Sequence, residues 1–170
     1  MLILVSGLPG SGKSYFASRL AEKLGTVYIN SDKTRKVLGA KGQYAFEDKL
    51  NVYEHMAGIA GKELRDGKVV VIDATFYRRE MREMFKTLAT LLHTPLQFIE
   101  VTANQELTRR RLSRPRADSE ANYAVFQQLS IEYEPLTEPH LVLESTDDNI
   151  DQMLALALSH LTSMNERKAD

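Results

Sequence analysis

Short apolar runs alternate with longer amphipathic segments along nearly the whole chain. Four-residue apolar runs, such as 2–5 and 69–72, predict strands buried on both faces, as the strands of parallel sheets are. Three other runs are shorter or less uniform and predict further strands. The predicted strands cover residues 2–5, 27–29, 69–72, 96–101 and 141–143.

The segments between these runs carry apolar residues at helical spacing; Tyr53, Met56, Ala60 and Leu64, for example, share one stripe. Strands that alternate with helices predict an α/β fold with three layers, in which helices cover both faces of a parallel sheet of about five strands. The predicted helices cover 13–24, 31–38, 49–65, 78–93, 106–113 and 119–133 and a last one starting at 150, with a loop at 39–48 and a polar tail at 165–170.

A glycine-rich octet follows the first predicted strand and leads into the first predicted helix. It matches the P-loop pattern G-x-x-x-x-G-K-[ST] at every fixed position. Because strand, loop and helix occur in the order that the pattern requires, we interpret the octet as a P-loop and the sheet as that of a P-loop NTPase. The octet consists of Gly7, Leu8, Pro9, Gly10, Ser11, Gly12, Lys13 and Ser14.

Each residue type in the octet suits the binding of a triphosphate. Glycines let the backbone wrap a phosphate so that successive N–H groups point inward, and the start of the helix adds its positive dipole end. Lys13 is expected to reach the β- and γ-phosphates, and the Ser14 hydroxyl to bind Mg²⁺. Tyr15 and Arg110 complete the predicted nucleotide-binding set. The octet therefore predicts that the chain binds a nucleoside triphosphate together with Mg²⁺.

Composition and charge narrow the class of protein. The chain has 170 residues, of which 43% are hydrophobic, and we expect one domain over residues 1–164. No apolar stretch approaches the roughly 18 residues of a membrane span, and no basic region precedes the first apolar run, so we expect neither a membrane segment nor a signal peptide. The absence of cysteine fits a cytoplasmic protein, and the net charge of −1 gives no field that would attract a long nucleic acid.

The carboxyl ends of parallel strands are where ligands bind, which draws attention to Asp32 and Arg35 after the second strand. Their spacing of three residues places both on one helical face. A carboxylate there could accept the proton of an attacking hydroxyl, and an arginine could hold a phosphate or the carboxylate. The alternative is that Ser31 or Asp32 only caps the helix.

Asp73 follows the third apolar run and occupies the position of a Walker-B acid, which orients Mg²⁺ or its waters. Ser14 and Asp73 are therefore the candidate metal-binding residues.

Five arginines fall within the eight residues 109–116, with no acid among them. Arginine forks suit phosphate oxygens and stabilise a transferring phosphoryl group. Arg111 and Arg114 are our candidates because their spacing aligns them on one face, and Arg110 lies on the neighbouring face. The segment 104–133 could form a movable lid over the triphosphate. The alternative for most of the run is a solvated basic face.

The acceptor of a phosphoryl group is the least defined part of the prediction. The loop 39–48 could bind it, with Tyr44 or Phe46 stacking on a base; otherwise this loop is a simple connector. Further candidates for the cleft are Tyr53, His55, Tyr77, Arg78 and Arg79.

These motifs together resemble those of the small P-loop kinases related to polynucleotide 5′-kinases and, more distantly, zeta-type toxins. The resemblance rests on the octet, on Ser31-Asp32-x-x-Arg35, on the strand that ends in Asp-Ala-Thr-Phe at residue 76, and on the arginine-rich segment. It implies transfer of the γ-phosphoryl group of Mg·ATP to a hydroxyl, with Asp32 as general base and Arg35 on the acceptor or phosphate. It also implies that Arg111 or Arg114 reaches the moving phosphoryl group.

Other functions share the P-loop. A GTPase switch would need an Asn-Lys-x-Asp motif, which Asn30-Ser31-Asp32-Lys33 does not supply, and an ATPase usually has a catalytic acid where Ala74 follows Asp73. A regulatory module without catalysis would not need Asp32. We therefore expect a kinase whose partner is a hydroxyl-bearing small molecule or a nucleic-acid 5′ end. The sequence indicates no obligate protein partner.

Overall fold

The computed structural model describes residues 1–40, 42, 45–114 and 121–166. These residues form a five-stranded parallel sheet in the order β2-β3-β1-β4-β5, which confirms the predicted fold class. The elements are β1 (Leu2–Ser6), α1 (Lys13–Leu24), β2 (Val27–Asn30), α2 (Ser31–Val37), α3 (Phe46–Arg65), β3 (Val70–Asp73), α4 (Arg79–Leu91), β4 (Leu96–Thr102), α5 (Gln105–Leu112), α6 (Tyr123–Glu132), β5 (Leu141–Glu144) and α7 (Ile150–Glu166).

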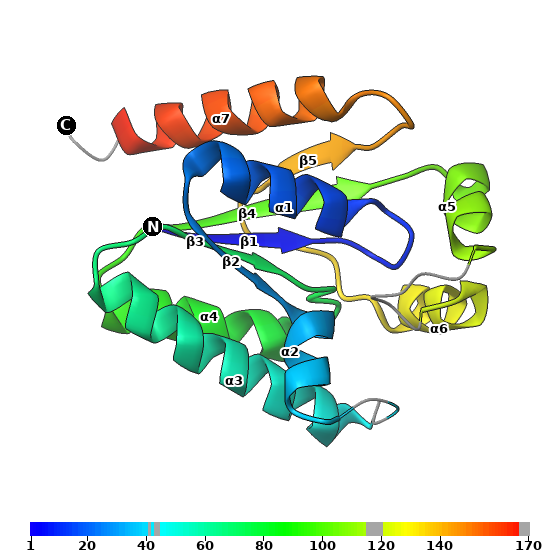
Figure 1. Cartoon of the computed structure of the whole chain (residues 1–170), viewed down its shortest axis with the longest axis horizontal. Helices are drawn as coiled ribbons and strands as arrows, with labels where there is room; N and C mark the ends of the chain where they lie inside the picture. The colour runs from blue at the N-terminus through cyan, green and yellow to red at the C-terminus, as the bar shows by residue number, and fades with distance from the viewer. Residues whose placement is uncertain (41, 43–44, 115–120, 167–170) are drawn as a thin grey trace.

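The central strand β1 is buried over its full length, and its side chains alternate between two cores. Leu2 and Leu4 pack with the residues of α3 and α4, whereas Ile3 and Val5 pack with those of α1 and α7. Figure 1 shows the corresponding layers, with α1 and α7 on one face of the sheet and α3 and α4 on the other. A continuous apolar run is therefore required in β1, because both of its faces are covered.

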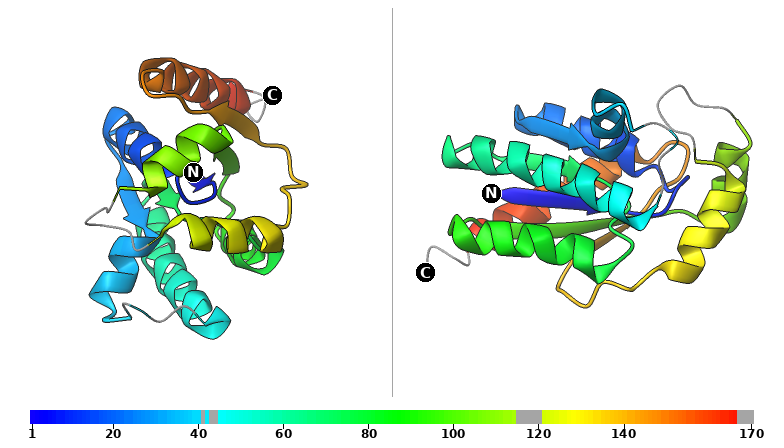
Figure 2. Two further views of the ribbon diagram at one scale, coloured as in Figure 1. Left: turned by 90° about the vertical axis from the view of Figure 1, so that its right-hand side faces the viewer. Right: turned by 90° about the horizontal axis from the view of Figure 1, so that it is seen from below.

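Helices α5 and α6 do not cover a face of the sheet. They lie beyond the carboxyl ends of the strands, at the same end as the loop between β1 and α1 (Figures 1 and 2). The predicted lid contains both helices, and its segment 115–120 lies outside the described residues. No helix in the described ranges is both long and apolar enough to cross a membrane.

The predicted element boundaries agree within a few residues, and the three clearest differences concern α3, α6 and α7. Helix α3 begins at Phe46 rather than at 49, so the predicted loop 39–48 is shorter. The sequence prediction started the helix at Lys49, but the helix begins three residues earlier at Phe46, with Glu47 and Asp48 near the positive end of the helix dipole. Helix α6 is described from Tyr123, not 119, and α7 runs to Glu166, two residues into the predicted tail.

The end of α6 is bound to the segment that follows β3. The Glu134 N–H donates to the Tyr77 carbonyl at 2.8 Å, and Arg78 pairs with Glu132 at 2.8 Å. The buried Arg82 side chain of α4 completes this connection, because one of its nitrogens donates to the Glu134 carbonyl at 2.8 Å. The position of α6 is therefore set by contacts with residues about 50 positions earlier in the chain.

We expect Arg82→Met to lower the free energy of unfolding by about 3 kcal/mol. Arg82 donates to the carbonyls of Phe76, Glu134 and Pro135, and methionine would leave these oxygens without their donor. Urea unfolding followed by circular dichroism measures the loss. Arg79→Met, at an exposed position of the same helix, is the control. A loss for Arg82→Met no larger than that of the control would contradict this role.

Candidate functional site

The loop between β1 and α1 has the backbone of a phosphate-binding loop. Gly7, Gly10 and Gly12 have φ angles of 153°, 82° and 90°, all in the region that favours glycine. A Cβ atom on Gly7 would lie 2.4 Å from the carbonyl oxygen of Val101, so no other residue fits there. The octet therefore adopts the glycine-dependent backbone that its interpretation as a P-loop requires.

Two side chains hold carbonyl groups of this loop. The Ser145 hydroxyl donates to the Ser11 carbonyl at 2.6 Å, and Arg111 donates to the Gly10 carbonyl at 3.2 Å. Arg111 also donates to the Ser145 hydroxyl at 2.7 Å and to the Thr146 carbonyl at 2.8 Å. These hydrogen bonds fix the carbonyl groups of Gly10 and Ser11 and so stabilise the course of the loop.

Asp73, at the end of β3, is fully buried and is held by two residues of the neighbouring strand β2. Its Oδ2 accepts hydrogen bonds from the Tyr28 hydroxyl at 2.8 Å and from the Asn30 amide at 2.5 Å. Burial, together with the nearby Asp73 charge, raises the pKa of the Tyr28 phenol well above its ordinary value. The phenol therefore keeps its proton at neutral pH and remains a donor to Asp73.

The residues at the Asp73 position fit Mg²⁺ bound together with a nucleotide. Asp73 Oδ1 is buried and has no hydrogen-bond partner among the described residues. The Tyr28 hydroxyl that binds Asp73 also lies 3.5 Å from the Ser14 carbonyl, so the Ser14 backbone and the Asp73 carboxylate both lie close to this phenol. No group of three or more potential metal ligands occurs within the described residues. A magnesium ion here would therefore take most of its ligands from phosphates and water, as it commonly does.

Helix α2 carries Asp32 and Arg35, and its N-cap is neither Ser31 nor Asp32. The cap is Asn30, whose side-chain oxygen accepts from the Lys33 N–H at 2.9 Å. Asp32 lies in the first turn, and its carboxylate is 3.8 Å from an Arg35 guanidinium nitrogen. The Asp32 side chain is 37% exposed, whereas that of Arg35 is 10% exposed. The alternative of a capping role for Ser31 or Asp32 is therefore wrong.

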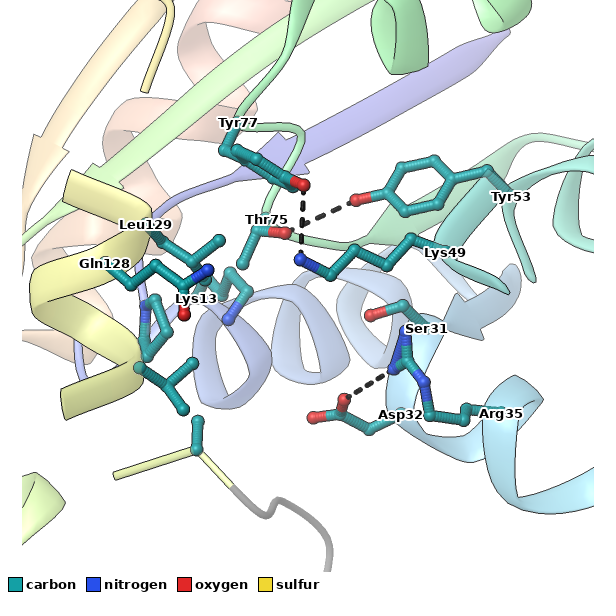
Figure 3. A pocket seen from close by; sticks show the side chains of 13 residues that line it. Lys13, Ser31, Asp32, Arg35, Lys49, Tyr53, Thr75, Tyr77, Gln128 and Leu129 are labelled. Carbon is teal, nitrogen blue, oxygen red and sulfur yellow. Dashed lines mark hydrogen bonds and ion pairs between the residues drawn. The ribbon is translucent and has the colours of Figure 1, made fainter. Parts of the chain in front are cut away.

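Asp32 and Arg35 line a cavity of about 340 Å³, which we call the Asp32 cavity. Figure 3 shows side chains that converge on it from α1, α2, α3, α6 and the end of β3. Lys13 of the P-loop octet is one of them, so the expected phosphate-binding lysine and the expected base face the same space. The lining consists of Pro9, Lys13, Ser31, Asp32, Arg35, Lys49, Tyr53, Thr75, Tyr77, Ala121, Val125, Gln128 and Leu129.

The wall of the Asp32 cavity after β3 contains a strained turn. Phe76 has a φ angle of 48°, which is unusual for a residue with a side chain. Its N–H donates to the Tyr53 hydroxyl at 3.0 Å, and its buried ring packs edge-on against the ring of Phe85 with centroids 5.4 Å apart. The Tyr53 hydroxyl in turn lies 3.4 Å from the Thr75 hydroxyl. These contacts fix the direction of the Thr75 side chain toward the cavity.

A second cavity of about 490 Å³, the Tyr15 cavity, includes Gly12 of the same loop. Its residues come from the start of α1, from α5 and from the loop between β5 and α7, and Tyr15 is 57% exposed within it. The three candidate arginines Arg110, Arg111 and Arg114 all line this cavity and not the Asp32 cavity. Its other lining residues are Phe16, Ser145, Thr146, Asp147, Asn149, Ile150 and Met153.

The residues that the sequence suggested for the acceptor site differ in where the structure places them. Tyr53 and Tyr77 line the Asp32 cavity, whereas His55 and Arg79 are exposed and line neither cavity. Phe46 packs against the core and under Arg78, whose guanidinium carbon is 4.7 Å from the ring centre. Tyr44 lies outside the described residues, as do Pro115 and Arg116.

Sequence reasoning missed several residues of the site. Asn30 and Ser145 each stand at or directly after the end of a strand, so the rule that led to Asp32 and Asp73 could have found them. No comparable signal marked Lys49, Tyr28 or Gln128, because they become neighbours of the site only through the packing of β2, α3 and α6.

The match to a known family covers most of the chain. A family model described as "AAA domain" matches residues 2–136, which include the P-loop octet, Asp32 and Asp73. The chain belongs to this family. The resemblance that the motifs indicated is thus supported at the level of the P-loop kinase superfamily. The narrower likeness to polynucleotide kinases and zeta-type toxins stays a prediction.

Several known proteins are similar to this chain over nearly its full length. A probable adenylyl-sulfate kinase of Aeropyrum pernix is 24% identical over 173 residues, 98% of this chain and 94% of that protein. The APS kinase CysC of Mycobacterium tuberculosis, solved with AMPPNP and APS, has a TM-score of 0.74 at 21% identity and covers 95% of this chain and 96% of its own. A gluconokinase of Sinorhizobium meliloti has a TM-score of 0.76 at 17% identity, covering 98% and 94%. These likenesses establish the fold.

We expect Arg111→Ala to raise the KM for ATP about tenfold, which corresponds to the loss of about 1.4 kcal/mol from a charge-assisted hydrogen bond. The reason is that Arg111 holds the Gly10 carbonyl and Ser145, which shape the phosphate loop. Steady-state kinetics with varied ATP measures the change, and Arg65→Ala, at an exposed arginine of α3 that lines neither cavity, is the control. A loss of kcat with an unchanged KM would instead favour the role that the family resemblance implies, a contact with the transferring phosphoryl group.

Proposed function

We propose that this chain is an ATP-dependent kinase that phosphorylates a hydroxyl group of a small molecule bound in the Asp32 cavity. The observation that carries the proposal is that Lys13 and Asp32 line one cavity at the carboxyl end of the sheet. A phosphate-binding lysine and a carboxylate that can accept a proton are the two groups that phosphoryl transfer to an alcohol requires.

The reaction that this arrangement supports is a direct transfer. Asp32 accepts the proton of the acceptor hydroxyl while the oxygen attacks the γ-phosphorus atom. A new O–P bond forms, the bond from the γ-phosphorus to the β,γ-bridging oxygen breaks, and ADP leaves. Lys13 and the inward N–H groups of the loop stabilise the negative charge on the phosphates. Ser14 and Asp73 would hold Mg²⁺, which would supply further neutralisation of this charge.

In this proposal the nucleotide and the acceptor occupy different cavities. The phosphates of ATP occupy the loop, and the Tyr15 cavity, which shares Gly12 with that loop, takes the nucleoside. Tyr15 and Arg110, which the sequence predicted to bind the nucleotide, line this cavity together with Arg114, which was predicted to be catalytic. The Asp32 cavity on the other side of Lys13 then takes the acceptor, and its volume of about 340 Å³ suits a small molecule.

Two further features favour a kinase over an ATPase. The residue after Asp73 is the buried Ala74, so this position offers no second carboxylate to activate water. The names of the similar proteins, an adenylyl-sulfate kinase and a gluconokinase, are those of kinases that act on small molecules.

The proposal is tested with γ-labelled ATP and Mg²⁺ over a panel of acceptors. The panel contains sugars, sugar acids, nucleosides, nucleotides and 5′-hydroxyl oligonucleotides, with free phosphate measured in parallel. We expect label on a small-molecule class and none on the oligonucleotides. Phosphate release that no acceptor changes would favour an ATPase, and labelling of the oligonucleotides alone would identify a polynucleotide kinase.

A further inference from the structure

We propose that the acceptor carries an acidic group (a carboxylate, sulfate or phosphate) in addition to its hydroxyl, and that Lys49 binds this acidic group. This inference deepens the proposed function and rests on it, because it names the substrate class of the Asp32 cavity. Lys49 would be a specificity-determining residue, and the chemistry of transfer would remain with Asp32 and Lys13.

The charges of the Asp32 cavity leave one cation for the acceptor. Among the described residues, four charged side chains line it: Lys13, Asp32, Arg35 and Lys49. Lys13 is expected on the phosphates of ATP, and Asp32 and Arg35 lie 3.8 Å apart as an ion pair. Among the described residues Lys49 forms no ion pair, and its one hydrogen bond is to an uncharged phenol. With the nucleotide bound, the acceptor part of the cavity is therefore positive.

Lys49 is held in a fixed position with donors to spare. Its Nζ donates to the Tyr77 hydroxyl at 3.2 Å and lies 4.8 Å from the centre of the Tyr77 ring. Tyr77 is 2% exposed, so its ring is a rigid support for the lysine. Figure 3 shows the lysine extending from α3 across the cavity to Tyr77, with Ser31 and Asp32 on the opposite wall. An ammonium group has three donors, and the hydrogen bond to Tyr77 uses one of them.

The nearby acid that could neutralise Lys49 is engaged elsewhere. Glu132 of α6 pairs with Arg78 at 2.8 Å, and this hydrogen bond is the largest cause that lowers the pKa of the Glu132 carboxyl. Arg78 lies on the Tyr77 ring as well, 5.6 Å from its centre. Glu132 thus forms its hydrogen-bonded ion pair with Arg78, and its weaker attraction to Lys49 uses none of the donors of that lysine.

The rest of the lining suits a small polar molecule with one charged end. Ser31, Thr75 and Gln128 offer hydroxyl and amide groups, whereas Val125 and Leu129 of α6 are apolar. Apolar side chains exclude water and so strengthen the attraction between an ammonium group and an acid. An acceptor whose hydroxyl lies at Asp32 and whose acidic group lies at Lys49 would use both walls of the cavity.

The test compares acceptors in pairs that differ in one acidic group: gluconate with glucitol, glycerate with glycerol, and adenosine 3′-phosphate with adenosine. Phosphoryl transfer is measured for wild type, Lys49→Met and the control Lys62→Met, an exposed lysine on the same helix α3. We expect the wild type to prefer the acid by at least about tenfold in kcat/KM, the effect of one charge-assisted contact. Lys49→Met should remove this preference by raising the KM for the acid alone, and Lys62→Met should retain it.

A binding measurement separates this inference from the proposed function. The protein is saturated with Mg·AMPPNP, which occupies the phosphate loop, and each pair is titrated calorimetrically at constant ionic strength. Selective binding of the acids that Lys49→Met abolishes, without transfer to any acceptor, would support this inference and contradict the kinase. Transfer to both members of a pair at equal kcat/KM would support the kinase and contradict this inference. Equal binding or no binding of all pairs, or equal losses for acid and neutral partner in Lys49→Met, would overturn the inference.

Discussion

Replacing Lys13 with alanine is expected to lower kcat/KM for phosphoryl transfer by at least about 10³-fold, the upper range for removing one preorganised charge-stabilising group. Lys13 stands at the first position of α1, directly after the glycine turn, and its side chain lines the Asp32 cavity. The developing charge on the transferring group would then lose its nearest fixed cation. Transfer of label from γ-labelled ATP to the identified acceptor measures the loss.

The matched control is Lys23→Ala, an exposed lysine in the last turn of the same helix. It removes one positive charge and the same side chain without touching the cavity, so it reports the effect of net charge and helix stability alone. If Lys13→Ala retained wild-type turnover, the interpretation of the octet as a catalytic P-loop would be wrong.

Replacing Asp32 with asparagine is expected to lower kcat by about 10²–10⁴-fold, the usual contribution of a general base, while ATP affinity stays nearly unchanged. Asparagine keeps the shape of the side chain but cannot accept the proton of the acceptor hydroxyl. The side chain is partly exposed and does not cap its helix, so the fold should tolerate the change. Single-turnover transfer and calorimetric binding of AMPPNP give the two quantities separately.

The control for Asp32→Asn is Asp151→Asn, an exposed acid in the first turn of α7. Both substitutions remove a negative charge from the positive end of a helix, so the control measures the loss of that dipole interaction. Equal losses of rate and of nucleotide affinity in Asp32→Asn would indicate that Asp32 mainly orders α2 or holds Arg35 near the phosphates.

The fold could be predicted because burial on both faces leaves a direct trace in the sequence. The runs at 2–5 and 69–72 are apolar throughout because β1 and β3 lie inside the sheet between two helical layers. The P-loop could be predicted because its backbone geometry depends on glycine, as the contact of Gly7 with the Val101 carbonyl demonstrates. In these cases a residue's type is set by its own local surroundings.

The supports of the site could not be predicted in the same way. Asp73 is visible at the end of a strand, but its partners Tyr28 and Asn30 depend on β2 lying beside β3, and strand order is not written in the hydrophobic pattern. Arg111 was singled out for its charge and its spacing from Arg114. Its contacts with Gly10 and Ser145 join residues separated by more than 100 and more than 30 positions, which no local pattern encodes.

The phosphate loop is defined mainly by its backbone, whereas the Asp32 cavity is defined by side chains. The phosphate loop is shaped by the backbone torsions of its glycines, and a Cβ atom on Gly7 would clash with the Val101 carbonyl, so side chains at the glycine positions would distort it. The Asp32 cavity is lined by side chains from α2, α3 and α6, and residues such as Lys49, Val125 and Gln128 can be exchanged without altering that loop. A lineage or an engineer can therefore change which molecule is phosphorylated while the donor stays the same. A small library at these three positions would be the natural starting point for new acceptors.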